Sequence, residues 1–95
     1  MIVREVSLHV PIDRQAEFVS FWKDEYREAM SRQPGFLAAR LLKSTDSEDE
    51  LQMMLEFATE EHAAGWRASP EHKRLGPRLK ELAPVLTVKV LVPVG

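Results

Sequence analysis

The chain has 95 residues, a formal net charge of −2, no cysteine, and apolar side chains at 44% of its positions. This length suits one domain with a thin core, over residues 1–95, and the lack of cysteine excludes disulfides, thiolate nucleophiles and cysteine-ligated metal sites. Near-neutral charge argues against nucleic-acid binding, and no apolar run reaches the roughly 20 residues of a membrane helix, so we expect a cytoplasmic protein without nucleic-acid or membrane partners.

A strand followed by a long helix is predicted for the first third of the chain. Residues 2–10 alternate, with Val6, Leu8 and Val10 on one face and a mixed set on the other. The mixed face carries Val3, Glu5, Ser7 and His9. Asp13 is predicted to cap a helix that runs to about residue 32. Large apolar side chains recur in this helix at three- and four-residue spacing and should face the sheet: Phe18, Val19, Trp22, Tyr26, Ala29 and Met30.

Two further strands are predicted after Pro34-Gly35, which stops the helix. Residues 36–43 form the first of them. Its pattern places Leu37, Ala39 and Leu41 on one face and Phe36, Ala38, Arg40 and Leu42 on the other. The polar run 44–50 is typical of a hairpin connection, and residues 51–58 alternate as the next strand.

The last third of the chain is predicted to contain short helices and a final strand. Thr59 begins one helix, and Ser69 caps another that has Pro70 at its first position. Gly76-Pro77 is expected to interrupt this second helix, which leaves residues 78–82 as a separate turn. The valine-rich residues 85–94 form the last strand.

The order β-α-β-β-α-β predicts an α+β, ferredoxin-like fold, in which a four-stranded antiparallel sheet has helices on one face. The opposite face would be partly apolar. It would expose Val3, Phe36, Ala38, Leu42, Met54 and Leu91 beside Glu5, Arg40, Glu56 and Lys89. We expect a homodimer through this open sheet face. The alternative is a monomer in which this face of the sheet is exposed to solvent.

Two segments carry a family resemblance: Pro34-Gly35-Phe36-Leu37 after the first helix, and Trp66-Arg67-Ala68-Ser69-Pro70-Glu71-His72 after the third strand. With the element order, they make the chain resemble the antibiotic biosynthesis monooxygenase (ABM) domain family of the dimeric α/β-barrel superfamily. The resemblance covers nearly the whole chain. It implies one ABM-like domain over residues 1–95 that pairs as a dimeric α/β barrel.

The resemblance admits more than one activity, because the family includes cofactor-independent monooxygenases of aromatic quinols and haem-degrading enzymes. In the haem-degrading members an asparagine on the first strand, a tryptophan and an iron-ligating histidine form the site. Trp66 matches the tryptophan, but the chain contains no asparagine, and the ligand histidine would fall near Gly76. Haem degradation is therefore the third-ranked expectation.

His72 and His9 are the candidate catalytic residues. His72 lies at the third position of its helix, where the positive helix end lowers its pKa and suits a proton acceptor; a half-exposed surface histidine is the alternative. His9 either lines a cavity or bonds across a dimer seam. His62 is expected to be a surface residue.

Trp66, Tyr26, Trp22 and Arg40 are the candidate pocket residues. Trp66 is predicted to stack on a flat substrate or to pack in the core, and Trp22 and Tyr26 are predicted core residues of which Tyr26 can reach a ligand. Arg40 either binds an anionic oxygen or pairs with Glu5 or Glu56.

The function hypothesis is a cofactor-independent monooxygenase that acts on a small aromatic, quinol or polyketide-like substrate. It predicts no bound cofactor and no metal. The alternative is a non-catalytic dimeric module. Such a module would bind a small apolar or aromatic ligand or be associated with stress.

Overall fold

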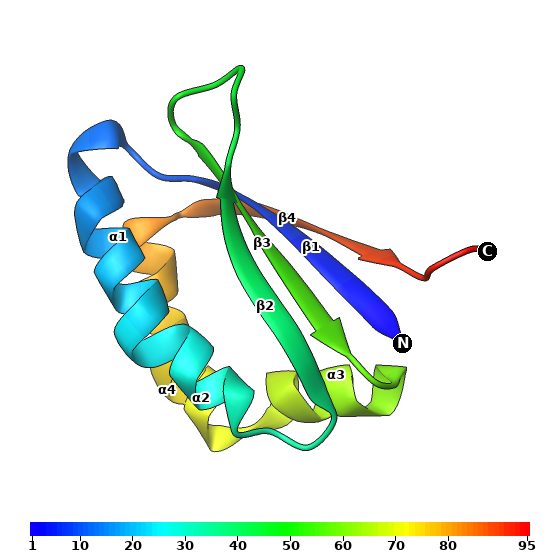
Figure 1. Cartoon of the computed structure of the whole chain (residues 1–95). Coiled ribbons are helices and arrows are strands. Elements are labelled where there is room, and N and C mark those ends of the chain that lie inside the picture. The colour runs from blue at the N-terminus through cyan, green and yellow to red at the C-terminus, as the bar shows by residue number, and fades with distance from the viewer.

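A four-stranded antiparallel sheet is the centre of the fold in the computed structural model, which describes residues 1–95 (Figure 1). Its strands are β1 (Ile2–His9), β2 (Phe36–Lys43), β3 (Glu50–Phe57) and β4 (Val85–Leu91). They lie in the order β2-β3-β1-β4, and each neighbouring pair is antiparallel. The predicted ferredoxin-like fold is confirmed, although β4 ends at Leu91 and not at residue 94.

The helices gather on one side of the sheet (Figure 1). A continuous helical path combines η1 (Ile12–Arg14), α1 (Gln15–Phe21), η2 (Trp22–Tyr26) and α2 (Arg27–Ser31), and α3 (Glu60–Ala68) and α4 (Pro70–Leu82) follow β3. The core lies between these helices and the sheet, and its fully buried side chains include Leu8, Phe18, Met30, Met53 and Phe57. No helix of the structure is long and apolar enough to cross a membrane.

The N-terminal helical path differs from the predicted uniform helix. Asp13 is not its cap, because the chain enters a 3₁₀ turn directly after Pro11, and Asp13 lies within that first turn. The segment η2 is a π-helix, in which the N–H of Arg27 donates to the carbonyl of Trp22 five residues earlier. Such wide turns are rare and occur frequently at functional sites. Here the turn carries the buried Trp22 and Tyr26.

The predicted bounds of β2 are confirmed, but the faces predicted for its first two residues are wrong. A β-bulge between Phe36 and Ala38 pairs Phe36 with Phe57, so Phe36 packs against the core and not on the open face. The two rings meet edge to face, with centroids 6.1 Å apart. Leu37, predicted to face inward, is 52% exposed. The extra residue of a bulge shifts the alternation of side chains, which a strict period of two does not describe.

The helix α4 continues through Gly76 and Pro77, which corrects the predicted interruption. Proline removes one helical hydrogen bond, but buried leucines on both sides of it hold the helix to the core: Leu75, Leu79 and Leu82. The predicted helix start at Thr59 and the predicted cap at Ser69 are confirmed. Thr59 accepts a hydrogen bond from the backbone N–H of His62, and Ser69 accepts one from that of His72, each at 3.2 Å.

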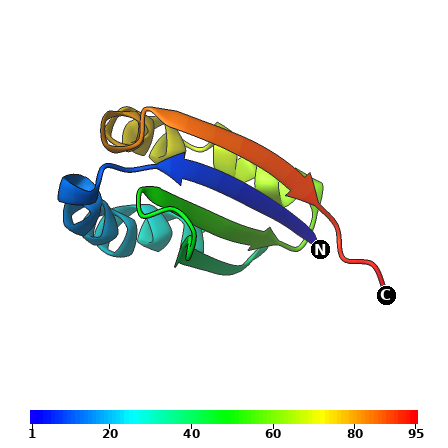
Figure 2. The same cartoon turned by 90° about the horizontal axis from the view of Figure 1, so that it is seen from above.

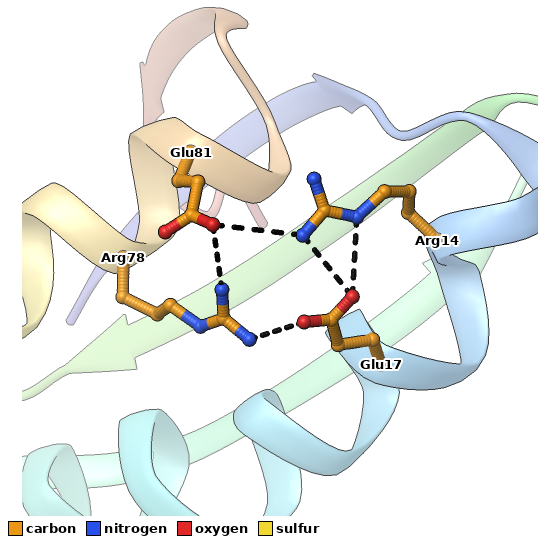
Figure 3. A network of polar contacts seen from close by, with 4 residues as sticks. All are labelled: Arg14, Glu17, Arg78 and Glu81. Carbon is orange, nitrogen blue, oxygen red and sulfur yellow. Dashed lines mark hydrogen bonds and ion pairs between the residues drawn. The ribbon is translucent and has the colours of Figure 1, made fainter.

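An ion network joins α4 to the start of the N-terminal helical path (Figure 3). Arg78 contacts Glu17 and lies 3.0 Å from Glu81, and Arg14 lies 3.1 Å from Glu17 and 3.7 Å from Glu81. Hydrogen bonds from Arg78 and then Arg14 hold the pKa of Glu17 below its usual value. Because the four side chains are between 35% and 58% exposed, water screens these pairs and the network adds little to the stability of the fold.

The sheet face opposite the helices is uncovered (Figures 1 and 2). Leu42 and Leu91 are 40% and 41% exposed on it, beside partly exposed Val3, Ala38 and Met54. Glu5 accepts a hydrogen bond of 2.7 Å from Gln52 and forms no ion pair with Arg40. The chain after β4 extends beyond the sheet, beside the N-terminus (Figure 2).

Candidate functional site

A cavity of about 230 Å³ lies between the helix-covered sheet face and the helices α3 and α4. Its walls are mainly apolar: Val6 from β1, Leu55 from β3, Leu79 from α4 and Leu86 from β4 contribute to them. The sheet alternation that turns these strand residues inward also turns Arg4 inward, because Arg4 precedes Val6 by two positions.

Three rings line this cavity together: Tyr26 of η2, Trp66 of α3 and His72 of α4. The rings of Trp66 and His72 meet edge to face at 5.1 Å between centroids. Trp66 also meets Tyr26 edge to face at 5.4 Å, and the Tyr26 and His72 centroids are 6.5 Å apart. The structure therefore brings together three residues that the sequence had proposed for the site.

The junction between α3 and α4 explains how Trp66 and His72 reach one wall. Ser69 ends α3 and caps α4. Its hydroxyl donates to the carbonyl of Trp66 at 2.7 Å and accepts from the backbone N–H of His72. This side chain is 8% exposed, and it ties the last turn of one helix to the first turn of the next. The serine of the sequence motif thus orients both ring-bearing residues.

The protonation states of the two titratable rings suit proton transfer. Burial, followed by the positive charges of Arg4 and Arg67, lowers the pKa of His72, so its imidazole is neutral at neutral pH and can accept a proton. Burial raises the pKa of Tyr26 to about 12, against smaller opposing effects of Arg4 and of the nearby Trp66 indole. The phenol therefore stays protonated and can donate a hydrogen bond.

The cavity has a basic lining that the sequence analysis missed. Arg4, Arg67 and Lys80 contribute to its walls, and no aspartate or glutamate does. Burial and then the charge of Arg67 lower the pKa of Arg4. The sequence could have identified Arg4 as a residue that faces inward. Arg4 is the one charged residue in the alternating series Ile2, Arg4, Val6, Leu8 and Val10, and the other members of this series are all buried.

Trp22 and Arg40 do not line this cavity. They line a separate groove of about 520 Å³ between the N-terminal helical path and β2. Trp22 is 4% exposed and stacks on Tyr26, with centroids 5.9 Å apart, so it supports the tyrosine from the side of the core. Arg40 is exposed.

His9 lies outside both the cavity and the groove. It ends β1 on the open face, is exposed, and has its Nδ1 atom 3.8 Å from an oxygen of Asp49. The two histidines proposed as catalytic are therefore not neighbours in the structure. Gly76 lines the cavity near the position expected for a haem ligand and offers no donor side chain. No three His, Cys, Asp or Glu residues are grouped to hold a metal ion.

Comparison with known proteins identifies relatives of this chain. The family model of antibiotic biosynthesis monooxygenases matches residues 1–77. A search of curated proteins found no significant match.

Solved structures share the fold over almost the whole chain. SnoaB from Streptomyces nogalater, a cofactor-independent oxygenase solved in a mutant form, superimposes with a TM-score of 0.86 at 18% identity, over 99% of this chain and 93% of that one. Rv0793 from Mycobacterium tuberculosis superimposes with a TM-score of 0.83 at 17% identity, over 99% of this chain and 95% of that one. A conserved protein from Methanosarcina mazei superimposes with a TM-score of 0.84 at 18% identity, over 99% of this chain and 94% of that one.

These identities are low, and the superpositions show the fold alone. The family model, in contrast, recognises the sequence itself over the greater part of its length. Its match ends within α4 and includes both segments on which the resemblance was based. The chain belongs to the antibiotic biosynthesis monooxygenase family.

Proposed function

We propose that the protein is a monooxygenase that oxidises a small electron-rich aromatic substrate, a quinol or a related phenol, without a bound cofactor. The observation that carries this proposal is the meeting of a neutral imidazole, a protonated phenol and an indole in one apolar cavity. Family membership supports an oxygenase, and the description of SnoaB as a cofactor-independent oxygenase supports the same class of reaction.

The chemistry requires the protein to remove one proton and to shield the product of that step from water. His72 accepts a proton from a hydroxyl of the quinol, and the resulting quinolate donates electrons to O₂. The balance is complete when one ring C–H carbon gains an oxygen atom, the ring is left as a hydroxyquinone, and the other oxygen leaves as H₂O with two of the hydrogens. The phenol of Tyr26 donates a hydrogen bond to a substrate oxygen, and Trp66 packs against the ring.

Substitution of His72 tests the assignment of the base. Purified protein would be screened with substituted hydroquinones, with oxygen uptake as the readout. His72→Gln should lower kcat by about 10²–10⁴-fold, because it keeps a polar side chain but removes the proton acceptor. His9→Gln should retain the wild-type rate, since His9 is outside the cavity.

Two results would contradict this assignment. A normal rate in His72→Gln would exclude His72 as the base, and a loss confined to His9→Gln would transfer the role to the open face. Ligand binding that survives in both variants, with no oxygen uptake by any form of the protein, would instead support the non-catalytic binding module.

The uncovered sheet face supports a homodimer as the working form. Partly exposed Met54 lies on the central strand β3 of this surface, and the exposed Leu42 and Leu91 lie on its edge strands β2 and β4, all without helical cover. Solution mass at micromolar concentration should be that of two chains. Met54→Lys should shift the mass towards one chain while the far-UV spectrum is unchanged. A wild-type protein that stays monomeric would refute the pairing.

A further inference from the structure

The basic side chains at the cavity have no acidic partners. Arg4 and Arg67 take part in none of the ion pairs of the structure, which involve Arg14, Arg32, Arg78 and His9. The chain as a whole has 15 acidic and 13 basic side chains. An environment with several cations and no carboxylate is therefore a local property of this cavity and not a reflection of composition.

The position of Arg4 makes this charge available inside the cavity. Arg4 lies on β1 opposite Leu55 of β3 and Val90 of β4, on the helix-covered face of the sheet. Glu5, the next residue, points to the open face, where Gln52 bonds it, so it cannot neutralise Arg4. A partly buried guanidinium without a counter-ion is unfavourable in the free protein, and an anionic ligand would relieve this.

We propose that Arg4, assisted by Arg67, binds an oxyanion of the substrate, so that the cavity selects small aromatic anions, phenolates or carboxylates, over neutral rings of the same size. This inference rests on the proposed function, since it specifies the substrate of the same cavity. The guanidinium fork matches a carboxylate or a phenolate oxygen, and the rings of Trp66 and Tyr26 provide the apolar contacts for an aromatic ring.

The volume of the cavity sets the size of the anion. A dry cavity of roughly 150 Å³ holds benzene in another protein, whereas drug-sized ligands occupy roughly 300–1,000 Å³. At about 230 Å³ this cavity is suited to one substituted ring or a small fused pair. A phenolate oxygen on such a ring also makes it a better electron donor to O₂, which is consistent with the proposed oxidation.

Binding of simple probes tests the inference without turnover. Benzoate and benzamide have the same shape and differ in charge, and the visible absorption of 4-nitrophenol reports its ionisation. The wild-type protein should bind benzoate at least tenfold more tightly than benzamide by calorimetry. It should also lower the apparent pKa of bound 4-nitrophenol by about 1–3 units. The first result identifies carboxylate binding, and the second identifies phenolate binding.

Substitutions then assign the effect to Arg4. Arg4→Met should remove the preference for benzoate and the dye shift while benzamide still binds, which shows that the cavity is intact. Arg4→Lys should retain part of both effects, because it keeps the charge but loses the two-pronged geometry. Arg74→Met is the matched control: Arg74 is exposed on α4, forms no ion pair and does not line the cavity. It should leave both effects unchanged.

Equal binding of benzoate and benzamide by the wild-type protein, together with an unchanged pKa of bound 4-nitrophenol, would overturn the inference, as would an identical loss in Arg74→Met. These failures differ from a failure of the proposed function. If quinols are oxidised with the same KM by wild type and Arg4→Met, the anion site is wrong and the oxygenase stands. If anions bind through Arg4 but no quinol consumes oxygen, the anion site is supported and the oxygenase is wrong.

Discussion

Gly35 is predicted to be the position at which a single methyl group most disturbs the fold. Its φ angle is +76°, in the region that favours glycine. A Cβ atom built on Gly35 would lie 2.1 Å from Cγ and 2.3 Å from Nδ1 of His62. The carbonyl of the same residue accepts a hydrogen bond of 2.8 Å from the N–H of Ala58, which joins the turn before β2 to the end of β3. The backbone here therefore has little freedom to move away from the imidazole.

Two separable effects set the expected size of the loss in Gly35→Ala. An L-residue in the left-handed region costs about 1–2 kcal/mol. Forcing a methyl group into an occupied site costs about 1–3 kcal/mol more, because His62 must leave its place. The sum is about 2–5 kcal/mol, a large fraction of the stability of a domain of this size.

A double-mutant cycle separates the two effects. His62→Gly removes both the imidazole and the Cβ atom, which lies 2.6 Å from the built methyl group, but retains the backbone N–H that Thr59 caps. In urea denaturation at fixed protein concentration, the double mutant Gly35→Ala/His62→Gly should be about 1–3 kcal/mol more stable than the sum of the single changes implies. The strain of the positive φ should remain. Strict additivity would refute the predicted contact, and a neutral Gly35→Ala would refute both arguments.

Three further predictions concern the helix cap, the imidazole and the ion network. Ser69→Ala removes the cap of α4 and should lower the free energy of unfolding by about 0.5–2 kcal/mol in urea; an unchanged value would contradict the cap. Arg4→Met removes a charge that disfavours the imidazolium, so the pKa of His72 should rise in an NMR titration, and a fall would contradict the sign. Arg78→Gln should cause a small loss of thermal stability that shrinks with added salt, whereas a large loss that is insensitive to salt would show that the network is more than a set of exposed pairs.

The secondary structure could be predicted where local rules apply. The alternation of β3 places Leu51, Met53, Leu55 and Phe57 on the core side, because successive side chains of a strand point to opposite faces. Ser69 could be identified as a cap from its own chemistry and from the proline that follows it. Such rules involve neighbours in sequence, so the element order and the fold class followed from them.

Local rules failed where distant contacts override them. Pro77 is a helix breaker by propensity, but the buried leucines on both sides of it keep α4 whole. Phe36 was assigned to the wrong face because the bulge is selected by packing against Phe57, a residue of another strand. Neither outcome is visible in the immediate sequence, since the free energy that decides each comes from burial against other elements.

The candidate site divides in the same way. The sequence by itself determined the fold class, the family and the residue types capable of proton transfer and stacking, among them Trp66 and His72. Only the tertiary structure decided which of these residues meet. It separates His9 from the cavity and adds Arg4, because a cavity is formed by side chains from six elements whose relative positions depend on how the helices pack on the sheet.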